Sequence, residues 1–327
     1  MIVLIAIICL CGCTGTEETI ELKVIPAGSL LEPFEVLEAE FEALHPGVDV
    51  QLEGHGSIQV VRQVTDLHRE VDVVAVADES LIPDMMYIPM EYGEGNYTDW
   101  YIPFATNRMV VAYTDASRYA DEITAENWQE ILMRPNVRVG FSNPMLDAAG
   151  YRTFMVCTLA EIYYGDDRIF DAIIGDNLKD PVTITEEDGV TVVTLPALVR
   201  PSNEKLAIRD GSIYLLSLLD AGGIDYAFEY LSVSRLYGLQ WIELPPEIDL
   251  GFTEYEENYE SVKVLLGFER FKSIGNERIG RRVVYGITIP ENAPHPDMAR
   301  EFVDFIVEEF RKGRPGWPQP CTPPADM

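Results

Sequence analysis

The sequence predicts an α/β protein built from two domains. A chain of 327 residues is about twice as long as a typical single domain. Segments with strand character alternate with segments of helical periodicity, which is the pattern of largely parallel sheets flanked by helices. Apolar residues make up 47% of the chain, which is enough for ordinary globular cores.

Two strand–turn–helix units open the chain. A strand at 22–25 leads through a tight turn at 27–29 into a helix from Leu30, where apolar residues recur at helical spacing. The second unit repeats this order, with a strand and turn in VDVQLEGHGS at 48–57 and a helix at 58–67. Two successive units of this kind indicate one sheet with parallel strands.

Further strands and helices follow in the middle of the chain. VDVVAVAD at 71–78 predicts a third strand, and IPFATNRMVVAYT at 102–114 predicts one long strand. A helix around Trp128 and a strand at 137–142 come next. The turn NPMLDAAGYR then leads into a long helix at Thr153–Tyr164.

The C-terminal half contains a hairpin, two more strands and a final helix. PVTITEEDGVTVVTL at 181–195 predicts a hairpin closed by its Asp-Gly dipeptide. The predicted strands are Ile224–Val233 and 281–290, and the helix is Pro296–Phe310 with an apolar face.

The order of these elements predicts two lobes with a ligand in the cleft between them. We expect the first lobe to comprise 20–105 plus 283–314 and the second lobe to comprise 106–282. The tail at 315–327 is rich in proline, and we expect it to be irregular.

The N-terminus has the pattern of a secretion signal. An apolar run at 2–10 is too short to span a bilayer, and Cys11-Gly12-Cys13 follows it. Residues 1–13 therefore predict a lipoprotein signal with Cys13 as the lipid-modified residue, although no Lys or Arg precedes the run. A buried N-terminal strand is the alternative.

Charge and cysteine content exclude several classes of function. The net charge of −31, from 55 acidic and 24 basic residues, makes nucleic acid a poor partner. The cysteines and the four histidines lack zinc-site spacing, so we expect no metal site or disulfide framework. A bridge between Cys157 and Cys321 stays open, and we expect no cofactor.

Two helix starts are candidate anion sites because each contains a Gly-Ser pair. Ser29 and Ser57 both lie where a strand turns into a helix, and the first-turn N–H groups of a helix attract negative charge. The two starts lie at the edge of the sheet where open α/β sheets bind ligands. Ordinary N-capping by serine is the alternative.

Two later segments add candidates. Asp147 lies at the start of a helix, where N-capping is its ordinary role, and Ala148 and Ala149 leave backbone N–H groups accessible there. Tyr230 lies near the end of a predicted strand, where its hydroxyl can donate a hydrogen bond. A half-buried aromatic residue is the alternative interpretation of Tyr230.

Evidence for an enzyme is weak. The sequence contains no G-x-S-x-G, H-E-x-x-H, Walker A or dinucleotide-binding motif. His55 lies beside the turn that contains Ser57, so a hydrolase using this histidine and a nearby serine stays open as an alternative.

The sequence closely resembles the archaeal molybdate/tungstate-binding proteins of ABC transporters. The similar stretches cover about 21–310 and include AGSLLEPFE, GHGSIQVVRQVTDL, VDVVAVADESLIPDMMY, ITAENWQEILMRPNVRVGFSNP, AGYR, IDYAFEYLSV, ELPPEIDL and VVYGITIP. The resemblance implies a two-lobed periplasmic-binding-protein fold with two crossover strands, whose lobes close over the ligand.

The resemblance also implies which residues bind the ligand. The binding positions of the family correspond to the hydroxyls of Ser29, Ser57 and Tyr230, the Leu30 N–H and the carboxylate of Asp147. Ala148 replaces the proline that usually follows this aspartate. Ser212 stands where the family has a second carboxylate. Asp210 or, less directly, Glu229 would have to supply this carboxylate instead.

A carboxylate beside a dianion is repulsive unless it coordinates the central atom. The resemblance implies that Asp147 reaches molybdenum or tungsten, which accept extra oxygen ligands, whereas sulfur and phosphorus do not. We therefore expect a monomeric, non-catalytic receptor on the extracellular face of the membrane that delivers molybdate or tungstate to an ABC permease. A sulfate or phosphate receptor is the nearest alternative, and a sensor subunit is another.

Overall fold

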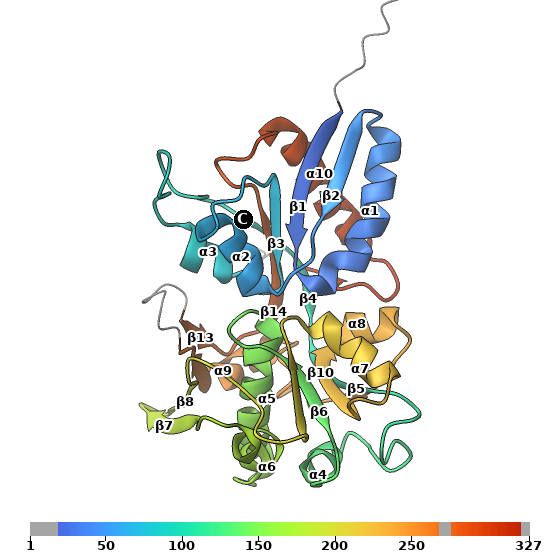
Figure 1. Ribbon diagram of the computed structural model, residues 1–327, viewed down its shortest axis with the longest axis vertical. Coiled ribbons are helices and arrows are strands. Elements are labelled where there is room, and N and C mark those ends of the chain that lie inside the picture. Colours follow the sequence, from blue (N-terminus) through green and yellow to red (C-terminus); the bar gives the residue numbers. More distant parts are fainter. Residues whose placement is uncertain (1–18, 268–275, 322–327) are drawn as a thin grey trace, which may run out of the picture.

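The computed structural model describes residues 19–267 and 276–321 and has an α/β architecture with three sheets (Figure 1). The predicted signal segment at 1–13, with Cys13, lies outside the described residues. Among the helices that the structure describes, none is long and apolar enough to span a bilayer.

A six-stranded sheet forms the first lobe together with helices α1, α2, α3 and α10. Its strand order is β15-β4-β14-β3-β1-β2. β1 is parallel to β2 and β3, whereas β14 is antiparallel to β3 and β4, so the sheet is mixed rather than mainly parallel as expected. The bounds are β1 (Ile20–Pro26), η1 (Gly28–Leu30), α1 (Leu31–Leu44), β2 (Val48–Leu52), α2 (Ser57–Thr65), β3 (Val73–Val76), α3 (Leu81–Met86), β4 (Ile102–Asn107), β14 (Val283–Thr288), α10 (Pro296–Lys312) and β15 (Gln319–Pro320).

Aromatic residues form the contact between helices α1 and α10 of the first lobe. Phe34 and Phe41 lie seven residues apart on α1, and both are buried. Each makes an edge-to-face contact with Phe302 of α10, at ring distances of 6.4 and 5.0 Å. The apolar face predicted for the C-terminal helix therefore packs against α1.

A five-stranded sheet in the order β11-β5-β10-β6-β9 forms most of the second lobe. β10 and β9 are parallel to β6, whereas β5 is antiparallel to β10 and β11. The bounds are β5 (Met109–Tyr113), α4 (Trp128–Met133), β6 (Val139–Ser142), α5 (Ala148–Tyr164), α6 (Ile169–Ile173), η2 (Gly175–Asn177), β9 (Leu206–Arg209), η3 (Ser212–Leu215), α7 (Leu216–Asp220), β10 (Tyr226–Tyr230), α8 (Leu231–Leu236) and β11 (Gln240–Glu243).

A separate four-stranded sheet, in the order β13-β12-β8-β7, completes the second lobe. The sequence did not predict it as a separate sheet. Its hairpin turns at Asp188 and Gly189, whose φ angles of 51° and 82° are left-handed, as the Asp-Gly dipeptide predicts. The bounds are β7 (Thr183–Glu187), β8 (Val190–Thr194), η4 (Thr253–Tyr255), α9 (Glu256–Tyr259), β12 (Val262–Leu265) and β13 (Glu277–Ile279).

The single strand predicted at 102–114 is wrong, because the chain changes sheets within it. β4 ends at Asn107 and β5 begins at Met109, so Arg108 lies between the lobes. The Asn107 side chain accepts the N–H of Arg108 at 3.0 Å and the Asp249 carbonyl accepts that of Met109 at 2.8 Å. These bonds replace ladder bonds at the crossover.

Three other boundaries differ from the prediction. The strand predicted at Ile224–Val233 ends at Tyr230, and α8 continues the chain because apolar residues alone do not distinguish a buried strand from a buried helix. The helix predicted from Thr153 begins at Ala148. In the tail that we expected to be irregular, Gln319–Pro320 pairs with β4.

Candidate functional site

A small cavity lies where the two lobes meet. It has a volume of about 10 Å³, room for roughly one water molecule. Its walls come from both lobes, and we call it the junction cavity: Gly28, Ser29, His55, Asp147, Gly211, Ser212, Ile213, Tyr214 and Tyr230. Four of the residues predicted from the sequence therefore line one cavity, although they are far apart along the chain.

Asp147 connects the two lobes through its carboxylate. It is the residue before α5, but its side chain makes no capping bond to its own helix. Oδ1 accepts the N–H of Ser57 at 3.4 Å and Oδ2 accepts the N–H of Ser212 at 3.1 Å. Burial raises the pKa of this carboxyl, while these N–H groups act in the opposite direction. Asp147 is therefore the N-cap residue of α5 by position, and its carboxylate also bonds to Ser57 of the other lobe and to Ser212.

Ser57 is not one of the residues that line the junction cavity, but its N–H donates to Asp147, which is one of them. It is the first residue of α2 and is fully buried. Its Oγ accepts the N–H of Ala77 at 2.9 Å. A backbone N–H can only donate, so the Ser57 proton stays available for another acceptor.

Tyr230 has the same arrangement. Arg152 Nη1 donates to the Tyr230 hydroxyl oxygen at 2.7 Å. Because a guanidinium has no acceptor, the tyrosine must accept here and its proton points elsewhere. Burial raises the pKa of Tyr230 well above its usual value, so the proton is retained.

Ser29 lies beside Tyr285 of β14, with 3.0 Å between the two hydroxyl oxygens. The Leu30 N–H, which we expected to face the ligand, donates to the Ala27 carbonyl at 2.8 Å in this structure. The hydroxyl of Ser29, rather than the N–H of Leu30, is thus the group of this turn that lines the cavity.

Ser212 does not direct its hydroxyl into the cavity. Its Oγ donates to Glu229 Oε1 at 2.9 Å, and the same oxygen accepts the N–H of Tyr230 at 2.7 Å. Glu229 is completely buried, and its Oε2 has no hydrogen-bond partner within the described part of the chain. Burial, with the nearby charge of Asp147, raises the pKa of Glu229 to about 8.

Sequence reasoning assigned Glu229 too small a role. Strand alternation up to Val233 placed it on the face opposite Tyr230. Both residues lie within β10 and have different partners, since Glu229 accepts from Ser212 and Tyr230 accepts from Arg152, but the partner of Glu229 also lines the junction cavity. No residue pattern within the strand indicated this contact.

A buried ion-pair cluster next to the cavity was also missed. Arg152 Nη1 donates to the Ala77 carbonyl at 2.7 Å, and its Nη2 lies 3.6 Å from Asp78. Tyr151 donates to the same carboxylate. Burial alone would raise the pKa of Asp78, but Arg152 and Arg278 lower it to about 2. The end of β3 is thereby tied to the first turn of α5 across the lobes.

The hydrolase alternative lacks its central contact. His55 Nε2 pairs with Glu53 at 2.8 Å, and among residues 19–267 and 276–321 no serine hydroxyl is bonded to it. The same residues contain no group of three or more His, Cys, Asp and Glu side chains suited to a metal ion. No disulfide joins Cys157 to Cys321, so the bridge left open by the sequence is not present.

The sequence of this chain matches a known protein family and several of its relatives. The family described as bacterial extracellular solute-binding protein matches residues 22–311. The chain is 45% identical over 311 residues to an uncharacterized solute-binding protein of Methanoculleus marisnigri, covering 90% of this chain and 84% of the relative. It is 40% identical over 306 residues to the molybdate/tungstate-binding protein WtpA of Thermococcus kodakarensis, covering 91% and 81%.

A solved structure supports the fold. The periplasmic molybdate-binding protein of Azotobacter vinelandii superimposes with a TM-score of 0.53 over 90% of this chain and 94% of its own, at 15% identity. The chain thus has the two-lobed fold of periplasmic binding proteins, with the junction cavity between the lobes.

Proposed function

The chain belongs to the family of bacterial extracellular solute-binding proteins, and from this premise we propose that it is a receptor for molybdate or tungstate. It delivers the oxyanion to the permease of an ABC transporter and catalyses no reaction. The observation that supports this most strongly is the set of hydrogen-bond directions around the junction cavity.

The cavity is arranged to donate hydrogen bonds. The hydroxyls of Ser57 and Tyr230 already accept from groups that can only donate, so both protons are free for a ligand oxygen. The N–H groups of Ser57 and Ser212 also point inward, where they hold a carboxylate. A ligand made of acceptor oxygens, such as a fully ionised tetrahedral oxyanion, fits this set of donors.

The carboxylate of Asp147 favours a metal oxyanion within this class. Asp147 is acceptor-only when ionised, and it would repel the oxygens of sulfate. Molybdenum(VI) and tungsten(VI) accept a further oxygen ligand, so the same carboxylate becomes attractive when it reaches the metal. Hydrogen phosphate is the second candidate, because its own O–H can donate to Asp147.

The ligand enters through separation of the lobes. The closed cavity of about 10 Å³ is too small for five heavy atoms, and Asp147 occupies the N–H groups of Ser57 and Ser212. Hinge opening at the crossover strands separates Asp147 from the N–H of Ser57, whereas the N–H of Ser212 stays in the same lobe as Asp147.

Competitive dialysis tests the ligand class. The ligand-stripped protein is dialysed against equimolar tungstate, molybdate, sulfate and phosphate, and the bound elements are then measured. We expect molybdenum or tungsten in a one-to-one ratio with protein and little sulfur or phosphorus. Retention of phosphorus alone would replace the metal oxyanion with hydrogen phosphate.

We further infer lipid attachment at Cys13 and a location on the outer face of the membrane. The inference follows from the apolar run and Cys11-Gly12-Cys13, which lie outside the described residues. A single anchored receptor per permease requires no oligomer. Mass spectrometry of the membrane-extracted protein should find a lipid on Cys13, and an unprocessed N-terminus would contradict the anchor.

Gly56 permits the close approach of the two lobes. A Cβ at this position would lie 2.5 Å from the Leu146 carbonyl oxygen and 2.7 Å from the Cβ of Asp147. We therefore expect Gly56→Ala to oppose closure by about 1–3 kcal/mol and to weaken oxyanion binding about 5- to 150-fold. Titration calorimetry measures the effect.

Gly54→Ala is the matched control for this variant. A Cβ at Gly54 meets only the flexible side chain of Leu31, at 3.2 Å or more. It should bind as the unmodified protein does. Equal affinities of the two variants would mean that the lobes do not close as described.

The raised pKa of Glu229 should make both oxyanion affinity and stability depend on pH. With a pKa of about 8, its carboxyl is mostly protonated at neutral pH and ionises at higher pH, which adds a negative charge near Asp147. Oxyanion affinity should therefore fall above about pH 8. Stability should also fall as the pH rises from the usual value of 4.5 toward 8, because the folded state holds the proton more tightly. Glu229→Gln should remove both trends, and an unchanged pH profile in this variant would show that another group titrates.

A further inference from the structure

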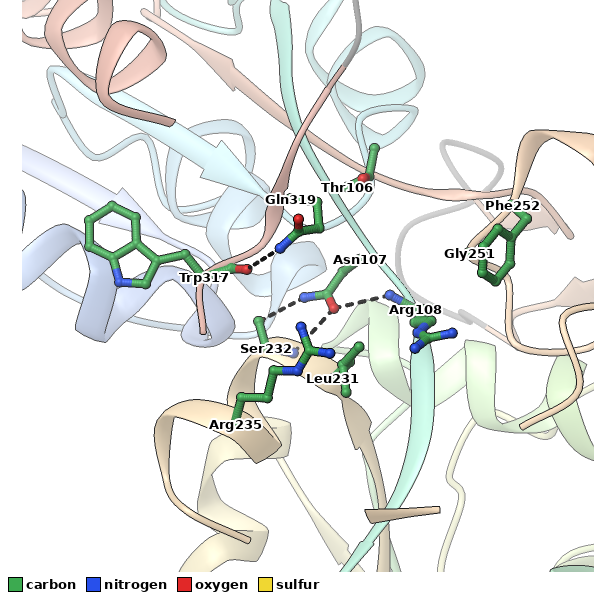
Figure 2. A pocket seen from close by; sticks show the side chains of 10 residues that line it. All are labelled: Thr106, Asn107, Arg108, Leu231, Ser232, Arg235, Gly251, Phe252, Trp317 and Gln319. Atoms are coloured by element: carbon green, nitrogen blue, oxygen red, sulfur yellow. Dashed lines mark hydrogen bonds between the residues drawn. The ribbon is translucent and has the colours of Figure 1, made fainter. Parts of the chain in front are cut away.

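Tyr285 and Asn107 form a chain of buried hydrogen bonds behind Ser29. Ser29 and Tyr285 lie 3.0 Å apart, and either hydroxyl can be the donor. Asn107 Nδ2 donates to the Tyr285 oxygen at 2.9 Å and to Ser232 Oγ at 2.8 Å. Figure 2 shows Asn107 at the crossover, directed toward Ser232 of α8. All four side chains are buried.

The orientation of the Asn107 amide is fixed by backbone groups. Its Oδ1 accepts the N–H of Arg108 at 3.0 Å and the N–H of Ser232 at 3.3 Å. Backbone N–H groups cannot accept, so the oxygen and not the nitrogen must face them. The NH₂ group therefore faces Tyr285, as a donor with no capacity to accept.

This orientation fixes the role of Tyr285 toward Asn107. Tyr285 accepts from Asn107, so its single proton is free for its other neighbour, Ser29. When Tyr285 donates this proton to Ser29, the proton of Ser29 itself is left for the junction cavity, which Ser29 lines. Burial keeps Tyr285 protonated, with its pKa raised to about 12.

We propose that Asn107 is a positioning residue of the binding site, which sets the direction of the Ser29 proton through Tyr285. The proposal rests on the proposed oxyanion function. It gives Ser29 the same property that Ser57 and Tyr230 have, a hydroxyl that already accepts a hydrogen bond from the protein and keeps its own proton for a ligand. Asn107 itself does not contact the ligand.

The substitution Asn107→Asp reverses the chain with almost no change in shape. The new carboxylate is acceptor-only, so Tyr285 turns its proton toward residue 107 and then accepts from Ser29. The backbone N–H groups of Arg108 and Ser232, with two hydroxyl donors, keep this carboxylate ionised. The oxyanion loses one charge-assisted hydrogen bond, and its affinity should fall about 10- to 100-fold.

The double variant separates the relay from simple charge repulsion. In Asn107→Asp with Tyr285→Phe, the added charge remains but the reversed tyrosine is gone, so the Ser29 proton is free again. Removing this hydroxyl should therefore restore most of the affinity lost in Asn107→Asp. Tyr285→Phe alone should change binding by less than about fivefold.

Titration calorimetry of the four proteins with tungstate and molybdate decides the question. Restored affinity in the double variant supports the relay. If the double variant loses as much affinity as Asn107→Asp alone, or as much as the two single variants together, Asn107 acts through charge or packing and the proposal is overturned. If the unmodified protein binds neither oxyanion, the proposed function fails instead, which is distinguishable from a failure of the relay.

Discussion

Replacing Ser29 and Ser57 together by alanine is expected to abolish oxyanion binding in the micromolar range and below. Each hydroxyl gives one hydrogen bond to a charged ligand in a buried site, and each such bond contributes about 1.5–3 kcal/mol. The combined loss corresponds to about a 100- to 20,000-fold lower affinity. Calorimetric titration with tungstate or molybdate measures this loss.

Ser212→Ala is the control within the same cavity. The Ser212 hydroxyl donates to Glu229 and does not face the ligand, while its backbone N–H remains in place. We expect this variant to lose less than about fivefold in affinity. Comparable losses in Ser212→Ala and in the double variant would contradict the hydrogen-bond directions described for the cavity. Denaturant unfolding must show that Ser57→Ala folds, because it leaves the Ala77 N–H without its acceptor.

Arg152→Met is expected to cost about 3–5 kcal/mol of stability, the usual effect of breaking a buried ion pair from one side. Arg152 is 1% exposed, and its guanidinium contacts Asp78, the Ala77 carbonyl and the Tyr230 hydroxyl. Its removal leaves the Asp78 carboxylate with less compensation in a buried site. The variant should also bind the oxyanion more weakly, because Tyr230 loses the donor that orients it. Urea unfolding and calorimetry measure the two effects.

Arg168→Met is the matched control. Arg168 pairs with Asp166, two residues away, and its side chain is 75% exposed. Loss of this pair should change stability little, because water screens and solvates exposed ions. If the free energy of unfolding falls as much in Arg168→Met as in Arg152→Met, the buried ion pair of Arg152 does not have the stabilising role described here.

The sequence was sufficient to predict the α/β class and the helix starts that contain Ser29 and Ser57. Both predictions depend on local patterns, namely periodicity and a Gly-Ser pair at a strand end. The position of Asp147 before a helix indicated N-capping, and its binding role followed only from the family resemblance; neither indicated its contact with Ser57 across the lobes. That contact depends on how the lobes approach each other.

The remaining errors have one physical origin. The break at Arg108 and the end of β10 at Tyr230 coincide with long-range hydrogen bonds, from the Met109 N–H to the Asp249 carbonyl and from the Leu231 N–H to the Arg108 carbonyl, which apolar periodicity does not indicate. The same holds for Glu229, which is near in space to Asp147 but 82 residues away in the sequence. Residue types predict which groups can donate or accept, and only the fold determines which of them meet.

The most direct test of the proposed receptor is a calorimetric titration of the ligand-stripped protein with tungstate, molybdate, sulfate and phosphate at matched ionic strength. Matching matters because a net charge of −31 repels every anion at long range. We predict tight, one-to-one binding of tungstate and molybdate and no heat from sulfate. Absence of binding by all four, from protein shown to be folded, would contradict the oxyanion assignment and leave only the solute-binding fold.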